Sequence, residues 1–277
     1  MDTKSLLFIS GITGFIGTSF LMNNKITNKF EIIGCSSSKN YKLTEEKLVE
    51  ISSEKMEKYL NQANEIRLLH LATFFSMDKE DDEKVNAANL TFGINLLEKL
   101  QNLPVKKIIY INTIFTLSDE KEILNSKYVH TKKSFSKKLD SFCKANHTNY
   151  DEIFIGNTFG KNDNRKKIIP LIIQSLKNGE KNPVINQDTY INFTDVGVII
   201  NFIDDCFEHN SSEKYIIYSK YQYNLGSIYT YLESVLNKRA PSQIKSKHNE
   251  IKENIPPDVK LLELDFDIYS SLIKLID

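Results

Sequence analysis

The sequence has no excess of charge of either sign and no long apolar run. Lys and Arg together number 36, as do Asp and Glu, so the chain has no overall field that would attract nucleic acid or an anionic membrane surface. No apolar stretch approaches the roughly 20 residues of a membrane-spanning helix. We therefore expect a protein that binds neither nucleic acid nor membrane.

Cysteine is also scarce. Cys35, Cys143 and Cys206 are odd in number and far apart, and the five histidines are scattered. This spacing predicts neither a disulfide framework nor a metal site. The first apolar run leads into a glycine-rich stretch and not into a signal-peptide cleavage site, so we expect a cytoplasmic protein.

Internal repeats and low-complexity linkers are absent as well, whereas short apolar runs recur and alternate with helix-like segments such as 85–100 and 128–143. This alternation predicts an α/β fold, a Rossmann-type doubly wound parallel sheet with its ligand at the carboxyl ends of the strands. The composition changes after the last run. We predict a dinucleotide-binding domain over residues 1–155 and a small, mainly substrate-binding C-terminal domain over 156–277. The apolar runs are 6–10, 30–36, 66–72, 106–112 and 151–157.

Three glycines follow the first apolar run and precede a helix-like segment. In a strand–turn–helix unit, the first glycine allows a tight turn, the second lets the backbone approach a pyrophosphate, and the third lets the helix pack on the strand. An ordinary turn would use glycines only for backbone freedom. The context favours a dinucleotide site made of Gly11, Thr13, Gly14, Phe15, Ile16 and Gly17.

The second apolar run ends without a carboxylate. NAD-binding folds usually place an acidic residue about 20 residues after the glycine motif, where it binds the ribose 2′-hydroxyl. Here Ser36, Ser37, Ser38 and Lys39 follow the strand, and they could bind and neutralise a 2′-phosphate. A polar surface loop would have a similar composition. The sequence favours NADP(H) over NAD(H).

Tyr128 and Lys132 are four residues apart, which puts them on one face of a helix. The preceding strand delivers Thr113 to the same sheet edge as the glycine turn. A phenol with an ordinary pKa of about 10 needs a nearby ammonium to exchange protons readily, and a hydroxyl can polarise a substrate oxygen. Such pairs also occur by chance on exposed helices, but this position predicts a catalytic trio in which Tyr128 is the acid–base group and Lys132 also binds the nicotinamide ribose.

The glycine turn, the run 70–73, Thr113 and the Tyr128–Lys132 pair together resemble the extended short-chain dehydrogenase/reductase family of the NAD-dependent epimerase/dehydratase type, over roughly residues 5–205. The resemblance implies a nicotinamide cofactor and a nucleotide-sugar substrate. It adds residues to the expected cofactor site, whereas His70 is expected to be a packing residue. The added residues are Leu71, Ala72, Thr73 and Asn89.

The resemblance continues in the second half of the chain. Asn157 matches a family Asn that contacts the diphosphate of a sugar nucleotide, and Asp195 matches an acidic residue that would cap the following helix. The family's phosphate-binding Arg is absent, so Arg165 or a neighbouring lysine would replace it. The implied substrate-binding residues are Thr113, Asn157 and Arg165.

Two segments, 70–75 and 157–167, are most similar to the family branch of CDP-abequose synthase-like reductases. We therefore predict an NADP(H)-dependent reductase of a nucleotide-linked 4-keto-6-deoxy sugar that serves the synthesis of surface-polysaccharide precursors. The alternatives are an epimerase or dehydratase with tightly bound NAD, and a catalytically silent dinucleotide-binding sensor or scaffold. In relatives, the helices near Asn89 and after Tyr128 form a dimer contact, so a homodimer is expected, although these helices could equally pack on their own sheet.

Overall fold

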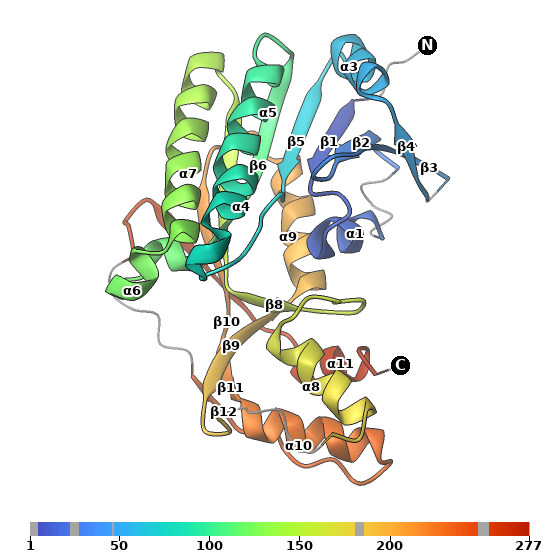
Figure 1. Ribbon diagram of the computed structural model, residues 1–277, viewed down its shortest axis with the longest axis vertical. Helices are drawn as coiled ribbons and strands as arrows, with labels where there is room; N and C mark the ends of the chain where they lie inside the picture. Colours follow the sequence, from blue (N-terminus) through green and yellow to red (C-terminus); the bar gives the residue numbers. More distant parts are fainter. Residues whose placement is uncertain (1–4, 23–27, 46, 181–185, 249–254, 277) are drawn as a thin grey trace.

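The computed structural model describes residues 5–22, 28–45, 47–180, 186–248 and 255–276, which form a larger and a smaller β-sheet (Figure 1). The larger sheet contains β1 (Leu6–Ser10), β2 (Glu31–Cys35), β3 (Asn40–Thr44), β4 (Lys47–Ile51), β5 (Ile66–His70), β6 (Val105–Thr113), β7 (Asn149–Ile155), β10 (Lys214–Ser219) and β13 (Val259–Leu264). The smaller sheet contains β8 (Asn157–Phe159), β9 (Tyr190–Asp195), β11 (Tyr221–Asn224) and β12 (Ser246–His248).

The larger sheet has the strand order β13-β10-β7-β6-β5-β1-β2-β3-β4. Every neighbouring pair from β13 to β2 is parallel, whereas β3 and β4 are antiparallel additions at one edge. Because β1 lies between β2 and β5, the strand order reverses there, and a crevice forms outside the carboxyl ends of these strands. The predicted Rossmann-type doubly wound sheet with a smaller C-terminal part is confirmed.

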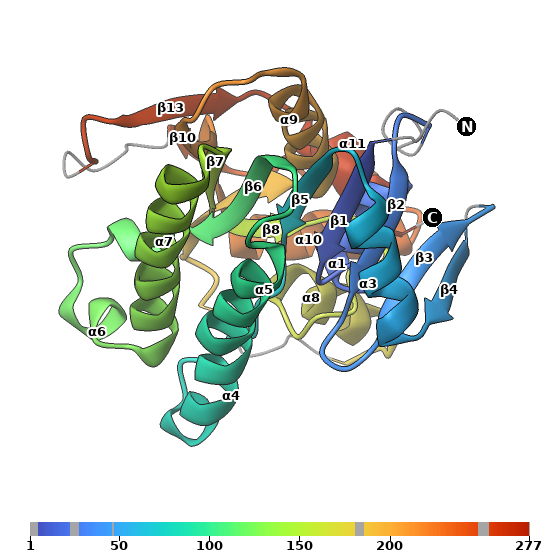
Figure 2. The same cartoon turned by 90° about the horizontal axis from the view of Figure 1, so that it is seen from above.

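Helices cover both faces of the larger sheet (Figure 2). Side chains alternate along each strand, so Leu7 and Ile9 enter one core and Leu6 and Phe8 the other. The first core packs against α1 (Phe15–Leu21) and α9 (Val196–Glu208). The second packs against α3 (Ser53–Gln62), α5 (Phe92–Leu100) and α7 (Lys127–Asn146).

The expected helix over 85–100 is not uniform. It consists of α4 (Asp82–Asn86), a π-helical turn (Ala87–Thr91) and α5, so an extra residue is accommodated within it. Short 3₁₀ turns at Lys79–Asp81 and Ile114–Leu117, and α6 (Lys121–Leu124), flank this region. Within the residues that the structure describes, no helix combines the length and apolar character needed to cross a membrane.

The smaller sheet packs with α8 (Ile168–Lys177), α10 (Leu225–Leu236) and α11 (Ile268–Ile273) around a separate core that includes Phe159, Ile172 and Ile228. The predicted boundary at residue 155 is where the chain first leaves the larger sheet. The chain returns to it, however, because α9, β10 and β13 all pack in the larger part. A single cut at residue 155 therefore does not separate the two parts: residues 156–277 supply strands to both sheets.

A buried ion pair joins β6 and β7 on the face covered by α9. The Lys107 Nζ lies 2.7 Å from the Asp151 Oδ2, and the two side chains are 3% and 1% exposed. Lys107 also donates a hydrogen bond to the Ser211 carbonyl. Removal of the lysine would leave a carboxylate without its counter-charge inside the protein.

We expect Lys107→Met to lower the free energy of unfolding by about 3–5 kcal/mol, because an uncompensated buried charge is costly. Urea denaturation would measure the loss. Lys106→Met, on the same strand but at an exposed position, is the matched control and should unfold like the parent protein. Equal stability of both variants would contradict a structural role for the pair.

Candidate functional site

The carboxyl ends of β1, β5, β6 and β7 meet at one edge of the larger sheet and open into a cavity of about 540 Å³. The segment from β8 to the start of α8 forms the opposite wall. Most of the predicted site residues line this cavity. They are Gly11, Gly14, Phe15, Ile16, Gly17, Leu71, Thr73, Thr113, Tyr128, Lys132, Asn157 and Arg165.

The glycine turn leaves no room for side chains at two of its positions. Gly11 has a φ of +74°, and a Cβ there would lie 2.9 Å from the Ala72 nitrogen. A Cβ on Gly17 would lie 2.5 Å from the Gly11 carbonyl oxygen, so this glycine lets α1 pack on the turn. Gly14 is the N-cap residue of α1. The turn therefore exposes bare backbone to the cavity, as a dinucleotide pyrophosphate requires.

Thr113, Tyr128 and Lys132 come together on the cavity wall. Thr113 ends β6, whereas Tyr128 and Lys132 lie one turn apart near the start of α7. The Ser126 side chain caps this helix by accepting a hydrogen bond from the Val129 N–H. The Tyr128 phenol lies close enough to the Thr113 hydroxyl for a hydrogen-bonding interaction that lowers the Tyr128 pKa. The geometry thus presents one phenol and one hydroxyl to the same point in the cavity.

Burial dominates the protonation of this trio. It raises the pKa of Tyr128 to about 12, although the hydrogen bond with Thr113 lowers it in part. It lowers the pKa of Lys132 to about 7, against the opposing effect of the Glu152 carboxylate. The Lys132 Nζ donates hydrogen bonds of 2.9 Å to the Thr73 Oγ1 and to the Ile111 carbonyl. The raised pKa of Tyr128 differs from the expectation that Lys132 depresses it. The reason is that the Lys132 ammonium is directed to those two oxygens and is itself easily deprotonated.

Asn89 and His70 lie behind the cavity and not on its wall. The Asn89 amide accepts a hydrogen bond from the Phe74 N–H at 2.8 Å and donates one to the Phe74 carbonyl at 2.9 Å, so the π-helical turn holds the loop after β5. His70 is buried, its Nδ1 lies 2.7 Å from the Ser10 Oγ, and burial lowers its pKa to about 3. It is a packing residue, as the sequence predicts. Ala72 also lies behind the wall, beside Gly11.

The segment predicted to select NADP(H) lies away from the cavity lining. After β2, the Ser36 N–H donates to the Lys39 carbonyl at 2.8 Å, and the exposed Lys39 Nζ forms an ion pair of 2.8 Å with Glu50 on β4. Ser37 and Ser38 are exposed at this turn, as is Thr13 in the glycine turn. A 2′-phosphate would have to compete with Glu50 for the lysine.

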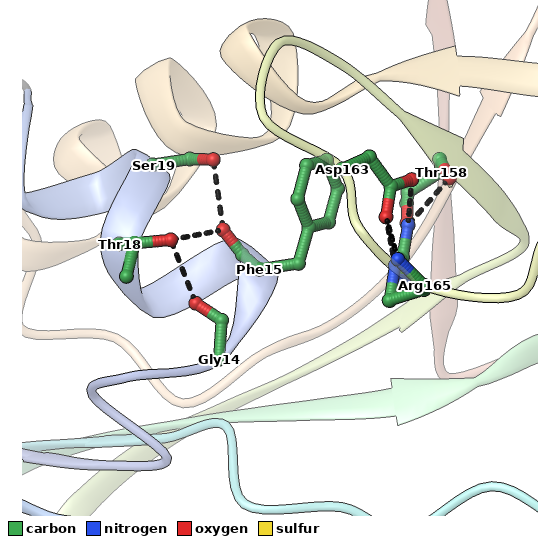
Figure 3. Close-up of polar contacts among 7 residues, drawn as sticks. All are labelled: Gly14, Phe15, Thr18, Ser19, Thr158, Asp163 and Arg165. Atoms are coloured by element: carbon green, nitrogen blue, oxygen red, sulfur yellow. Dashed lines mark hydrogen bonds and ion pairs between the residues drawn. The ribbon is translucent and has the colours of Figure 1, made fainter. Parts of the chain in front are cut away.

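Arg165 joins the loop after β8 to the start of α1 (Figure 3). Its Nε and Nη2 donate to the Asp163 carboxylate at 2.7 and 2.8 Å, and its Nη2 also donates to the Thr158 carbonyl at 2.8 Å. The guanidinium lies 4.1 Å from the centroid of the Phe15 ring. The sequence predicts a phosphate ligand here, but most donors of Arg165 are engaged within the protein, so the residue braces the wall of the cavity.

We expect Arg165→Met to lower the free energy of unfolding by about 1–3 kcal/mol, because the Asp163 side chain, which is only 3% exposed, loses its charged donor. Thermal unfolding monitored by circular dichroism would measure the change. Lys161 is an exposed residue of the same loop, and Lys161→Met should leave the midpoint temperature of unfolding unchanged. A midpoint equally unchanged in Arg165→Met would argue against the brace.

The sequence did not single out the phenylalanine rings beside Tyr128, and it considered the lysines next to Arg165 only as phosphate ligands. The Phe75 ring lies 4.9 Å from the Tyr128 ring in an edge-on contact and 6.3 Å from the Phe115 ring. The Lys167 Nζ lies 3.6 Å above the Phe75 ring. The available signals were two adjacent phenylalanines a few residues after a strand and three basic residues in one loop, and neither signal places a side chain in space.

A family model provides the deciding comparison: that of the NAD dependent epimerase/dehydratase family matches residues 7–219. The chain belongs to this family. The resemblance drawn from the glycine turn and the Tyr128–Lys132 pair is thereby confirmed at the family level. None of the curated protein sequences matches the chain.

Solved structures of this epimerase/dehydratase fold match almost the whole chain. UDP-glucuronic acid 4-epimerase from Bacillus cereus, in complex with NAD, is 15% identical with a TM-score of 0.75, and the match covers 98% of this chain and 95% of that one. UDP-glucose 4-epimerase from Thermotoga maritima, with UDP-glucose, is 17% identical with a TM-score of 0.74 and coverages of 98% and 97%. UDP-N-acetylglucosamine 4-epimerase from Methanobrevibacter ruminantium, in complex with UDP-N-acetylmuramic acid, is 18% identical with a TM-score of 0.73 and coverages of 100% and 98%. At these identities the likeness establishes the fold.

Proposed function

We propose that this member of the NAD dependent epimerase/dehydratase family is a nucleotide-sugar epimerase that keeps NAD bound and uses Tyr128 as its acid–base residue. The observation that carries the proposal is that Thr113, Tyr128 and Lys132 line the same cavity as the glycine turn. The three structures described above, each named as a 4-epimerase of a UDP-sugar, support this choice over net reduction.

The residues present fit a nicotinamide dinucleotide. Gly11 and Gly17 form a cradle that a Cβ would fill, and Thr73 and Lys132 would hold the nicotinamide end. When bound, the nicotinamide can accept a hydride from the sugar carbon and return it, so the reaction has no net redox change.

Side chains of the protein would carry out the proton transfer. Thr113, hydrogen-bonded to Tyr128, is placed to orient the sugar hydroxyl. The Tyr128 phenolate would take the proton of that hydroxyl as a keto group forms, and would give it back when the hydroxyl is restored. Because burial favours the neutral phenol, formation of the phenolate depends on positive charge nearby, which a bound oxidised nicotinamide would supply together with Lys132 in its protonated form.

The cavity also suits a phosphorylated substrate. Arg165, Lys166 and Lys167 lie on the wall opposite the sheet, and among the described residues that line the cavity none is acidic. Cations in a partly enclosed site bind diphosphate oxygens strongly. We propose that Asn157 and the two lysines contact the diphosphate, with Arg165 as their brace.

A dehydratase is less well supported by the chain. In the family that the chain resembles, a dehydratase typically has an Asp–Glu pair after the catalytic Thr. Here the acidic residues that follow Thr113, Asp119 and Glu120, are exposed and do not line the cavity. An acid and a base outside the cavity could not act together with Tyr128 on one substrate.

The second candidate is the NADP(H)-dependent 4-keto-6-deoxy-sugar reductase of the CDP-abequose synthase-like type. The turn after β2 favours it, because Ser36–Lys39 carries no carboxylate for a ribose 2′-hydroxyl. Retention of Thr113, Tyr128 and Lys132 argues for catalysis and against a silent sensor.

Identification of the resident cofactor tests these choices. The purified protein would be denatured, the released nucleotide identified by mass spectrometry, and the intact protein then assayed with UDP-, CDP- and dTDP-sugars and their 4-keto-6-deoxy derivatives. Bound NAD with interconversion of C4 epimers supports the proposal. Oxidation of NADPH by a 4-keto sugar overturns it in favour of the reductase, and cofactor binding without turnover overturns it in favour of a sensor.

We further propose a cytoplasmic homodimer that acts on surface-polysaccharide precursors. The apolar stripes of α5 and α7, including Leu97 and Phe135, pack on their own sheet. The dimer contact would therefore use the outer, more polar faces of these helices. Light scattering coupled to size-exclusion chromatography would distinguish a dimer from a monomer.

A further inference from the structure

Glu152 is a buried carboxylate in the middle of β7, and the mechanism above does not use it. Its side chain is on the face covered by α7, and the residue is 1% exposed. Glu152 Oε1 accepts hydrogen bonds from the Asn112 Nδ2 and the Ser136 Oγ, both at 2.6 Å. The carboxylate therefore links three elements, β6, β7 and α7.

Both hydrogen-bond partners of Glu152 lie next to members of the catalytic trio. Asn112 precedes Thr113, and its Oδ1 accepts a hydrogen bond of 2.8 Å from the Thr113 N–H. Ser136 lies one helical turn after Lys132, whose Nζ bonds to the Ile111 carbonyl, next to Asn112. Thr113 is thus held from behind by the cluster of Glu152, Asn112 and Ser136, and Lys132 is anchored on the carbonyl next to Asn112.

The opposite charges of the buried Glu152 and Lys132 also balance. Burying an isolated carboxylate or ammonium is expensive, and an opposite charge nearby reduces the cost. The Glu152 carboxylate acts electrostatically on Lys132 of α7 and raises its pKa. The other titratable groups around the two are His70 on β5, Tyr110 on β6, Tyr128 on α7, Tyr150 on β7 and Lys214 on β10.

We propose that Glu152 is a positioning residue: its carboxylate fixes Asn112 beneath Thr113 and balances the charge of the Lys132 ammonium. Its importance for turnover rests on the proposed function, in which Thr113, Tyr128 and Lys132 are the reacting trio. Without the carboxylate, burial alone would act on Lys132, and its pKa would fall further below the ordinary lysine value. The ammonium would then be lost on the acidic side of neutrality.

The test is Glu152→Gln, which has nearly the same shape and removes only the charge. The Lys132 side chain would be titrated by ¹³C NMR of lysine-labelled protein, with the resonance assigned by its disappearance in Lys132→Met. We expect the Lys132 midpoint to move at least one pH unit lower, a tenfold smaller protonation constant. An unchanged midpoint in folded Glu152→Gln would overturn the proposal.

Asp151→Asn is the matched control, because Asp151 is the adjacent buried carboxylate on the opposite face of β7, where it pairs with Lys107. It should leave the Lys132 midpoint unchanged. If Glu152→Gln does not fold, Glu152→Asp decides the positioning role: the shorter side chain keeps the charge but cannot reach both donors. Hydrogen exchange at the Thr113 amide should then be at least tenfold faster, and an unchanged rate would overturn the proposal.

These measurements need neither cofactor nor substrate. A shifted Lys132 midpoint together with no turnover of any sugar nucleotide would leave the role of Glu152 intact and refute the proposed function. Epimerisation with an unshifted midpoint would do the reverse.

Discussion

Tyr128→Phe is expected to reduce epimerisation by about 10²–10⁴-fold, the usual contribution of a positioned acid–base group. The variant loses only the phenol oxygen. The ring, which packs edge-on against Phe75, remains, so the fold and the cofactor site should change little. Turnover measured by NMR of the sugar anomeric signals, with NADH affinity measured by fluorescence, separates chemistry from binding.

Tyr110→Phe is the matched control for this experiment. Tyr110 is another fully buried tyrosine on the same side of the sheet, and its hydroxyl has no hydrogen-bond partner among the described residues. Its removal should leave turnover within a factor of about two, because no bond is broken. Unimpaired turnover in Tyr128→Phe would refute its role as the acid–base group.

Gly17→Ala should weaken dinucleotide binding by at least about 100-fold, equivalent to about 2.7 kcal/mol. The added Cβ would lie 2.5 Å from the Gly11 carbonyl oxygen and 2.7 Å from that of Ile12. Both neighbours are backbone atoms and cannot turn aside as a side chain could. The turn and α1 must separate, and the bare backbone that faces the cavity moves with them. Titration of the apoprotein with NADH would measure the loss.

Gly179→Ala separates this steric effect from a general cost of replacing glycine. Gly179 has a φ of +68° but nothing within 4 Å of an added Cβ. The substitution should cost about 1–2 kcal/mol of stability from backbone strain and leave NADH affinity unaltered. Equal affinity of Gly17→Ala and the parent protein would show that the turn does not hold the dinucleotide.

Local patterns sufficed to predict the parts of the fold and site that depend on nearby residues. Each apolar run of the first half became a strand, and the Tyr128–Lys132 spacing put both side chains on one helix face. Asp195 caps α9 through the Gly197 N–H, as its position before an apolar helix suggests. The apolar stripe over 85–100 predicts one continuous helix and does not predict the π-helical turn at Ala87–Thr91.

Features that join distant segments could not be predicted from the sequence. Asp151 and Glu152 are visible as two acids within an apolar strand, but their partners Lys107 and Ser136 come from different elements. Arg165 was predicted to contact phosphate in place of the family's missing Arg, and its ion pair with Asp163 is visible only in the folded structure. The direction of the Lys132 pKa shift depends on complete burial, which only the packed structure provides.

The strand order of the larger sheet also determines how long one strand edge stays unpaired while the chain is synthesised. β7, at residues 149–155, pairs on its outer side with β10, which begins at Lys214, and β10 in turn pairs with β13, which begins at Val259. During synthesis from the N-terminus, the edge of β7 stays unpaired while about 60 further residues emerge from the ribosome, at about 5–20 residues per second. An open edge strand can pair with other chains. The nascent protein is therefore exposed to aggregation for several seconds, and a chaperone that shields this edge should raise its yield.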